Sequence, residues 1–314
     1  MGFSLRIGSR PSQLAIAQAT AFKHALETKL PGLRSEIVAI KTSGDRLTAP
    51  SLANLGGKGL FIKELEEALR AGRIDIAVHS MKDLPAVLAP EFRMAAVPLR
   101  ENPRDALVTR DGSSLATLAR GARVGTASPR RKFEALRLRP DLAIAPLRGN
   151  VDTRLRKITD GELDAIILAM AGLRRINKAD AASVVELDER DFVPAAGQGA
   201  LAIEGMAGTM VANSAEIDLA LTEMTDRAAL AETSAERAFL ATIGASCVSP
   251  VGVKARLDGK TLSLSALLFS VDGSRTLSET IAETLESDGA AALVGVELGR
   301  LMIERGAAEL LSDG

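Results

Sequence analysis

Residues 74–85 read IDIAVHSMKDLP, a short apolar run followed at once by a polar turn. The apolar part has the length and composition of a buried β-strand. Similar runs alternate with amphipathic stretches along the first hundred residues, which predicts strands at 5–8 and 36–41 and helices at 11–29 and 60–71. This alternation predicts βαβ units on a mainly parallel sheet. Such sheets bind ligands beyond the carboxyl ends of their strands, so the polar residues 79–85 are expected at a functional edge.

A second region of the same kind covers about residues 106–193. Helices are predicted to begin at Ser128 and Asn150, and strands are predicted at 106–109, 122–125, 142–146 and 164–170. A charged connection at 99–105 (LRENPRD) and a glycine-rich one at 194–199 (PAAGQG) flank this region, and both are expected to act as hinges. The strand predicted at 200–204 is expected to return to the first lobe.

The pattern changes from Asp226 onward. A long helix to about residue 242 is followed by three alternating strands, near 248–256, 262–268 and 275–282, and by a closing helix. This predicts a smaller α+β domain. We therefore expect an α/β protein with two lobes and a C-terminal α+β domain, divided as residues 1–98 with 199–223, residues 99–198, and residues 224–314.

The composition argues against several functions. With 39 basic and 40 acidic side chains, the chain has no general attraction for nucleic acid or for an anionic membrane. No apolar stretch reaches the roughly eighteen residues of a membrane span, and the chain lacks the pattern of a secretion signal. One cysteine and two histidines argue against a zinc site, so no metal is expected. A single cysteine fits a reducing compartment, which predicts a cytoplasmic location.

Arginines gather at two predicted strand-to-helix turns of the middle lobe. Ser128-Pro129-Arg130-Arg131 follows one strand, and Leu147-Arg148-Gly149-Asn150, continuing to Arg154, follows the next. A helix start offers free backbone N–H groups, and a guanidinium binds a carboxylate through two parallel hydrogen bonds. Each arginine alone could be a solvated residue on a helix face. Because two turns repeat the arrangement, the pattern favours a crevice that binds a substrate with many carboxylates.

Three other segments each have two interpretations. Gly56-Gly57-Lys58-Gly59 lacks the spacing of a phosphate loop, so we interpret it as a flexible loop that carries Lys58 to the rim of the crevice. Asp83 could cap a turn, or it could act as an acid or stabilise a cation opposite the arginine-rich lobe. Cys247 could be an inert small hydrophobic residue or an attachment point.

Together these segments resemble those of porphobilinogen deaminases, also called hydroxymethylbilane synthases, over essentially the whole chain. Their order and spacing are highly specific: RPSQLA at 10–15, GGKGLF at 56–61, DIAVHSMKDLP at 75–85, NPRD at 102–105, SPRR at 128–131, LRGNVDTR at 147–154, residues 164–172, GQG at 197–199, and TSAER at 233–237 leading to Cys247. The chain departs from the family pattern at Asn54, often a lysine, at Pro129, often a leucine, and before the cysteine, where Gly-Gly is frequent.

The resemblance implies two lobes similar to periplasmic-binding-protein folds and a third domain that carries the cysteine. It implies a transferase that joins four porphobilinogen molecules head to tail, with loss of ammonia, into the linear tetrapyrrole hydroxymethylbilane. The growing chain is built on a dipyrromethane cofactor attached through a thioether to Cys247. The resemblance also implies a monomer that hands its product to the next enzyme of the pathway.

The resemblance assigns roles residue by residue. Asp83 matches the family's catalytic aspartate. The positions that match cofactor-binding or substrate-binding residues are Arg10, Ser12, Gln18, Lys58, Phe61, Lys82, Thr126, Ser128, Arg130, Arg131, Arg148, Gly149, Asn150, Arg154, Arg175 and Gln198.

Two rival functions start from the same residues. A two-lobed binding or sensing protein would close on an organic anion without transforming it, although the sequence shows neither a signal peptide nor an N-terminal helix-turn-helix segment. A cysteine-dependent acyl transferase would need a histidine base near Cys247, and the sequence offers His24 and His79.

Overall fold

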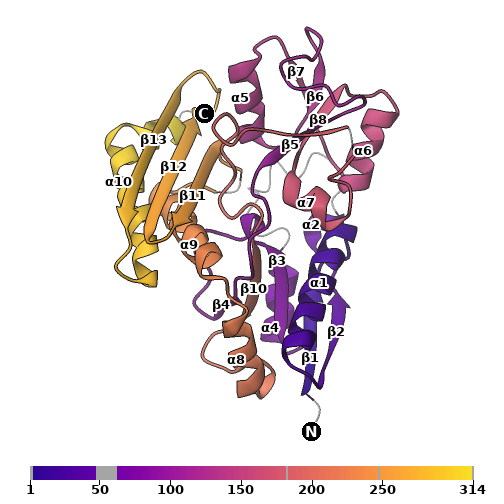
Figure 1. Cartoon of the computed structure of the whole chain (residues 1–314), viewed down its shortest axis with the longest axis vertical. Helices are drawn as coiled ribbons and strands as arrows, with labels where there is room; N and C mark the ends of the chain where they lie inside the picture. Colours follow the sequence, from indigo (N-terminus) through magenta and orange to yellow (C-terminus); the bar gives the residue numbers. More distant parts are fainter. Residues whose placement is uncertain (1–2, 47–61, 182, 247, 313–314) are drawn as a thin grey trace. The chain divides into compact units, whose positions relative to one another are not determined.

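The computed structural model describes residues 3–46, 62–181, 183–246 and 248–312, and the chain divides into two compact units. The first unit comprises Met1–Arg100 and Ala200–Leu230, and the second comprises Glu101–Gly199 and Ala231–Gly314. The colours of Figure 1 let the reader follow the chain through both units. The predicted middle lobe and C-terminal domain lie in one compact unit, and the finer division into three domains stays a prediction.

A five-stranded sheet forms the centre of the first unit, in the order β2-β1-β3-β10-β4. The first three strands are parallel, whereas β10 runs antiparallel to both β3 and β4. The strands span Phe3–Ser9 (β1), Leu33–Ala39 (β2), Ile76–Ser80 (β3), Phe92–Ala96 (β4) and Leu201–Met206 (β10). The helices and single 3-10 turns are α1 (Gln13–Lys29), α2 (Ser43–Arg46), α4 (Lys63–Arg70), η1 (Met81–Asp83), η2 (Val211–Asn213) and α8 (Ala215–Glu223).

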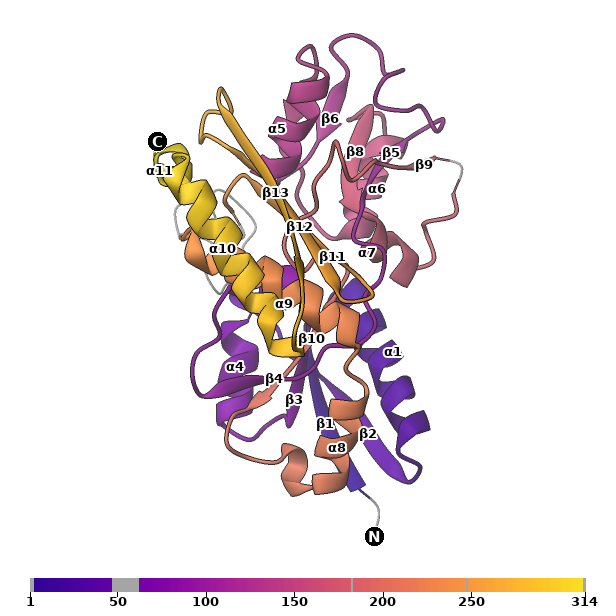
Figure 2. The same ribbon diagram turned by 60° about the vertical axis from the view of Figure 1, so that its left-hand side comes forward.

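Helices cover both faces of this sheet. Ala19, Phe22 and Leu26 recur at helical spacing on α1 and pack with α8 against one face. Leu65 and Leu69 of α4 pack against the other face, and Figure 2 shows α1 and α4 on opposite sides of the strands. The carboxyl ends of the parallel strands β1 and β3 lie at one edge of the sheet.

The second unit contains a sheet of the same pattern, in the order β7-β6-β8-β5-β9. β6 is parallel to β7 and β8, and β5 is antiparallel to β8 and β9. The elements are β5 (Asp105–Thr109), β6 (Arg123–Gly125), α5 (Pro129–Leu138), β7 (Ala143–Ala145), α6 (Val151–Thr159), β8 (Ala165–Ala169), α7 (Met170–Arg175) and β9 (Val184–Glu186). This confirms the two predicted α/β lobes, although each sheet has antiparallel strands that we did not predict.

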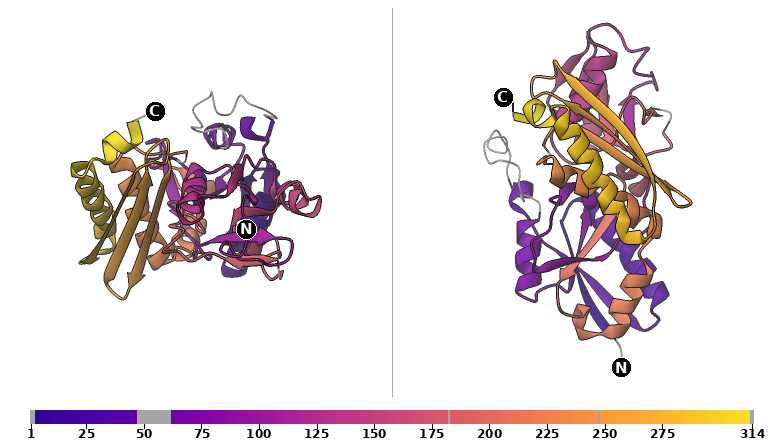
Figure 3. Two further views of the ribbon diagram at one scale, coloured as in Figure 1. Left: turned by 90° about the horizontal axis from the view of Figure 1, so that it is seen from above. Right: turned by 90° about the vertical axis from the view of Figure 1, so that its left-hand side faces the viewer.

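The C-terminal part is a three-stranded antiparallel sheet with helices, as expected for the predicted α+β domain. Its elements are α9 (Arg227–Thr242), β11 (Val251–Asp258), β12 (Thr261–Phe269), β13 (Thr276–Thr284), η3 (Asp288–Ala290), α10 (Ala291–Glu304) and α11 (Ala307–Ser312). Figure 3 shows α10 lying along this sheet. A Cβ on Gly295 would lie 2.1 Å from the Ala235 carbonyl oxygen, so this glycine lets α10 approach α9 closely. Among the described residues no helix combines the length and apolarity of a membrane span.

The two connections predicted as hinges are hydrogen-bonded to each other. The Glu101 N–H donates to the Gly199 carbonyl at 3.2 Å. Gly199 has a φ of +89°, and a Cβ at this position would lie 2.2 Å from the Glu101 carbonyl oxygen. The Val253 N–H on β11 donates to the Pro194 carbonyl at 2.8 Å, so the second connection also adds to the C-terminal sheet.

We expect Gly199→Ala to lower the free energy of unfolding by at least about 3 kcal/mol, because a methyl group there meets both a left-handed backbone and a clash with backbone. The free energy of unfolding, measured by urea titration of wild type and variant, checks this. Gly121→Ala is the matched control, since Gly121 has a φ of +75° with nothing within 4 Å of an added Cβ. Equal losses for the two variants would contradict the close approach.

Candidate functional site

The carboxyl end of β3 carries the predicted catalytic residue. Lys82 and Asp83 lie in η1, the turn that follows this strand, and the Asp83 side chain is exposed. The Met81 N–H donates to the Ala200 carbonyl at 3.0 Å, which fixes the turn to the start of β10. Asp83 is thus presented to solvent at the edge where the sequence predicts a functional crevice.

Residues of the β1–α1 turn share this edge because β1 and β3 are neighbouring parallel strands. Ser12 caps α1, with its side-chain oxygen accepting the Ala15 N–H at 3.3 Å, and the half-buried Arg10 lies just before it. Gln18 on α1 is buried, and its Nε2 donates to Ser80 Oγ at 3.0 Å. The structure therefore places Arg10, Ser12 and Gln18 on elements that end or begin at the same edge as Lys82 and Asp83.

The two histidines differ in burial. His79 is 5% exposed, and its Nε2 lies 3.0 Å from Glu204 Oε2 in the middle of the sheet. His24 lies on the exposed face of α1.

The two arginine turns of the second lobe also share one edge, because β6 and β7 are neighbouring parallel strands. Ser128 caps α5 by accepting the Arg131 N–H at 3.4 Å, and the buried Thr126 accepts the Ser128 N–H at 3.1 Å through Oγ1. Asn150 caps α6 by accepting the Thr153 N–H at 2.9 Å. Both helix starts thus follow the capping rule for Ser and Asn.

The turn before α6 exposes a guanidinium. Gly149 has a φ of +100°, a backbone conformation that favours glycine, and its carbonyl accepts a hydrogen bond from Arg154 Nε at 2.8 Å. Arg148 is exposed beside it. The geometry therefore suits anion binding at this helix start.

Arg130 and Arg131 point inward instead. They are 2% and 7% exposed, and both contact Asp105, which is fully buried at 0%. Arg130 Nη1 lies 2.8 Å from Asp105 Oδ2, and Arg131 Nη2 lies 2.7 Å from Oδ1. Burial alone would raise the pKa of Asp105, but the positive charges of the two arginines outweigh it and hold that pKa well below its usual value.

Gln198 joins the second connection to this cluster. Its Nε2 donates to Asp105 Oδ1 at 2.9 Å and to the Pro103 carbonyl at 2.6 Å, and its Oε1 accepts from Arg131 at 3.2 Å. Arg175 Nη2 donates to the Gly199 carbonyl at 2.7 Å, and burial lowers the pKa of Arg175 to about 10. The described contacts of Arg130, Arg131, Arg175 and Gln198 are thus within the protein, and their binding of cofactor or substrate stays a prediction.

Asp105 lies at the centre of this cluster, although it was not among the predicted site residues. It lies in the NPRD stretch quoted for the resemblance, at the start of a strand that is buried throughout. Two adjacent arginines at a buried helix start require a counter-anion, which is the signal that could have pointed to it.

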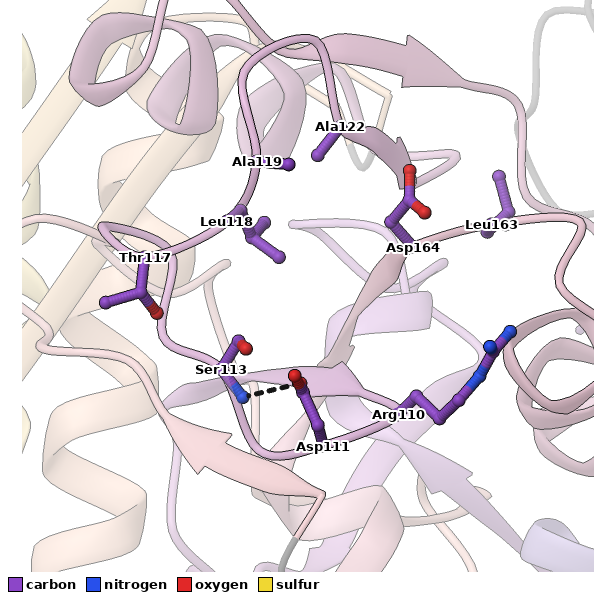
Figure 4. A pocket seen from close by; sticks show the side chains of 9 residues that line it. All are labelled: Arg110, Asp111, Ser113, Thr117, Leu118, Ala119, Ala122, Leu163 and Asp164. Carbon is purple, nitrogen blue, oxygen red and sulfur yellow. Dashed lines mark hydrogen bonds between the residues drawn. The ribbon is translucent and has the colours of Figure 1, made fainter.

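A pocket of about 400 Å³ lies elsewhere in the second unit. Figure 4 shows its lining, with Arg110 and Asp111 at one side and Asp164 at the other. Asp164 Oδ2 accepts the Arg123 N–H at 2.7 Å, which places the pocket at the amino ends of β6 and β8. The pocket therefore lies at the opposite edge from the arginine turns and holds none of the predicted site residues.

Three predicted site residues, Lys58, Phe61 and Cys247, lie outside the described residues. Within the described ranges, no group of three or more His, Cys, Asp or Glu side chains could hold a metal ion.

Comparison with known proteins gives matches along the whole chain. A family model described as "Porphobilinogen deaminase, dipyromethane cofactor binding domain" matches residues 5–213, and "Porphobilinogen deaminase, C-terminal domain" matches residues 230–304. The porphobilinogen deaminase of Syntrophobacter fumaroxidans is 43% identical over 98% of this chain and 97% of that protein. The porphobilinogen deaminase of Sorangium cellulosum is 49% identical over 88% of this chain and 90% of that protein.

The solved structures that match the chain are less similar in sequence. The VFT2 domain of Bordetella pertussis BvgS, in a double-mutant form, is 16% identical with a TM-score of 0.41, covering 71% of this chain and 86% of that one. The probable amino-acid ABC transporter extracellular-binding protein ytmK from Bacillus subtilis is 14% identical with a TM-score of 0.44, covering 71% of this chain and 92% of that one.

We expect Asp105→Asn to lower the free energy of unfolding by about 3–5 kcal/mol at neutral pH, because two buried guanidinium groups lose their counter-anion. The folded-state pKa of Asp105 lies below the unfolded value, so its stabilisation is complete above about pH 4 and is lost as the pH falls further. Urea unfolding over a range of pH checks both statements. Asp188→Asn, at an exposed pair with Arg190, is the control and should leave the midpoint nearly unchanged. A similar midpoint for Asp105→Asn and wild type would contradict the role of Asp105.

Proposed function

The chain belongs to the porphobilinogen deaminase family, and on this premise we propose that Asp83 is its catalytic group and Cys247 the attachment point of its cofactor. The enzyme is a transferase of tetrapyrrole biosynthesis that joins four porphobilinogen molecules head to tail, releases ammonia and yields hydroxymethylbilane. The observation that carries the residue assignment is the exposed carboxylate of Asp83 at the carboxyl end of β3, on the same edge as Arg10, Ser12 and Lys82.

The arginine turns fit a polycarboxylate. Each pyrrole unit brings an acetate and a propionate group, so chain growth adds negative charge at every step. Carboxylates that gather in a cleft of low dielectric repel one another unless cations match them. The helix starts at Ser128 and Asn150, with the exposed Arg148, offer N–H donors and a guanidinium fork for these groups.

A covalently attached cofactor fits the stepwise growth of a polycarboxylate chain. When bound, a dipyrromethane supplies the terminal pyrrole carbon to which the next unit is joined. A covalent tether would keep the growing chain at a high effective concentration between additions. We propose the tether at Cys247, which follows α9 in the sequence. The remaining predicted binding residues for cofactor or substrate are Gln18, Lys58, Phe61, Thr126, Arg130, Arg131, Gly149, Arg154, Arg175 and Gln198.

The proposed role of Asp83 is to accept a proton and to stabilise a cationic pyrrole. Loss of ammonia from porphobilinogen leaves a cationic pyrrole, and joining two pyrroles releases a proton. A carboxylate at the open edge can hydrogen-bond pyrrole N–H groups and stabilise that cation. We also propose that the enzyme works as a cytoplasmic monomer and passes its product to the next enzyme of the pathway.

We expect Asp83→Asn to lower kcat for porphobilinogen consumption by at least about 100-fold, because the amide keeps the shape but can neither take a proton nor balance a cation. A steady-state assay of product formation measures this, and an unchanged melting temperature shows that the fold is intact. Asp188→Asn, at the exposed pair with Arg190, is the control. Near-normal turnover of Asp83→Asn would remove Asp83 from catalysis.

We expect Arg148→Lys to slow elongation, with a KM about ten-fold higher, because an ammonium cannot reproduce the two parallel bonds of a guanidinium. The populations of enzyme carrying one, two or three added pyrroles, separated by ion exchange, show which step is slowed. Arg190→Lys changes an exposed arginine paired with Asp188 and serves as the control. Wild-type elongation in Arg148→Lys would exclude the proposed contact.

A further inference from the structure

Glu134 on α5 belongs to the buried cluster around Arg130. The residue is 0% exposed, and its Oε2 accepts a hydrogen bond from Arg130 Nη1 at 2.7 Å. The other oxygen, Oε1, is also buried and has no hydrogen-bond partner among the described residues. An ionised carboxylate with one buried and unbonded oxygen is costly, whereas a protonated one is much less so.

The Arg130 guanidinium also binds groups other than Glu134. The same Nη1 also donates to Asp105 Oδ2 at 2.8 Å and to the Val193 carbonyl at 2.8 Å. Asp105 takes a further charge-assisted bond from Arg131. A second ionised carboxylate at Glu134 would therefore compete with Asp105 for a guanidinium that is already bonded.

The other groups that face Glu134 do not change this balance. Arg130, Arg131 and Arg137 lie on its own helix, and Asp105 approaches from β5. β12, which packs against α5, has the sequence TLSLSALLF without a charged residue. Burial, reinforced by the negative charge of Asp105 and opposed by Arg130, raises the pKa of Glu134 to about 8.

We propose that Glu134 is a positioning residue that stays protonated at neutral pH, so that Arg130 and Arg131, balanced by Asp105 alone, retain one positive charge for a carboxylate of a bound pyrrole unit, incoming porphobilinogen included. Two guanidinium charges against one carboxylate leave a net charge of +1 in a region of low dielectric, where its field at the neighbouring helix start is strong. The identity of the anion rests on the proposed function, but the protonation of Glu134 does not.

The proposal has a defined pH dependence. As the pH rises through about 8, Glu134 releases its proton to solvent and cancels the retained positive charge. Affinity for an anionic ligand then falls. Because the folded pKa lies above the unfolded one, the contribution of Glu134 to stability is complete below the unfolded pKa and is lost as the pH rises through the folded pKa.

Infrared difference spectra of the whole protein test the protonation. We expect wild type minus Glu134→Gln to show the C=O stretch of a carboxylic acid at about pH 6.5, and to lose it by about pH 9.5. Glu134→Met, an apolar replacement of similar length, assigns the same band if the glutamine variant does not fold. Absence of the band at about pH 6.5 would overturn the proposal.

The KM for porphobilinogen tests whether ionised Glu134 weakens the binding of an anionic substrate. Glutamine has the shape of a protonated Glu134, so we expect Glu134→Gln to match wild type within about two-fold at about pH 6.5. At about one pH unit above the pKa, the KM of wild type should exceed that of the variant by about ten-fold. Glu162→Gln, at an exposed pair with Lys157, should follow wild type at every pH.

The outcomes separate the two ideas. A raised KM of Glu134→Gln at about pH 6.5 would show that the ionised form is needed, and equal KM values at high pH would show that the charge does not reach the ligand. Either result would overturn the inference. A protein that shows the acid band but never consumes porphobilinogen would refute the proposed function and leave the neutral Glu134 in place.

Discussion

The buried carboxylate of Asp105 holds together the parts of the second unit that carry the proposed chemistry. It stands at the start of β5, where the first connection ends, and it binds Arg130 and Arg131 from α5 and Gln198 from the second connection. Neither guanidinium could be buried at this helix start without an anion, since an isolated charge in the interior is too costly. One ion cluster thus fixes both connections and sets the charge available to a bound anion.

The fold and the chemistry are linked through these connections. Each five-stranded sheet takes its fourth strand, which runs antiparallel to both neighbours, from the segment that follows one connection. This strand is β5 in the second unit and β10 in the first. The parallel strands of both sheets end at turns that carry capping serines or asparagine, arginines and Asp83. The parallel pairing of strands within each sheet therefore also places the predicted binding groups at the carboxyl edge of that sheet.

Apolar periodicity and the alternation of strands with amphipathic stretches were sufficient to predict most elements. Ser128 and Asn150 cap the helices that were predicted to begin there, whereas the first helix was predicted from residue 11 and begins at Gln13, after its cap Ser12. β4 and β9 were missed, and so was the antiparallel direction of β5 and β10, because pairing with distant strands decides them. The inward direction of Arg130 could not be predicted either, since its partner Asp105 lies 25 residues away in the sequence. The local sequence pattern was enough to identify the turns. Tertiary contacts decide which of their side chains are exposed and which are buried.

The central claim is that the chain builds tetrapyrroles on a cofactor tethered to its single cysteine. Intact-protein mass spectrometry with peptide mapping around Cys247, on protein purified from cells that make porphobilinogen, tests it most directly. We expect an added mass equal to a two-pyrrole unit on the Cys247 peptide, and further increments of one pyrrole after brief exposure to porphobilinogen. A Cys247 that remains unmodified and freely alkylated, even after incubation with porphobilinogen, would contradict it.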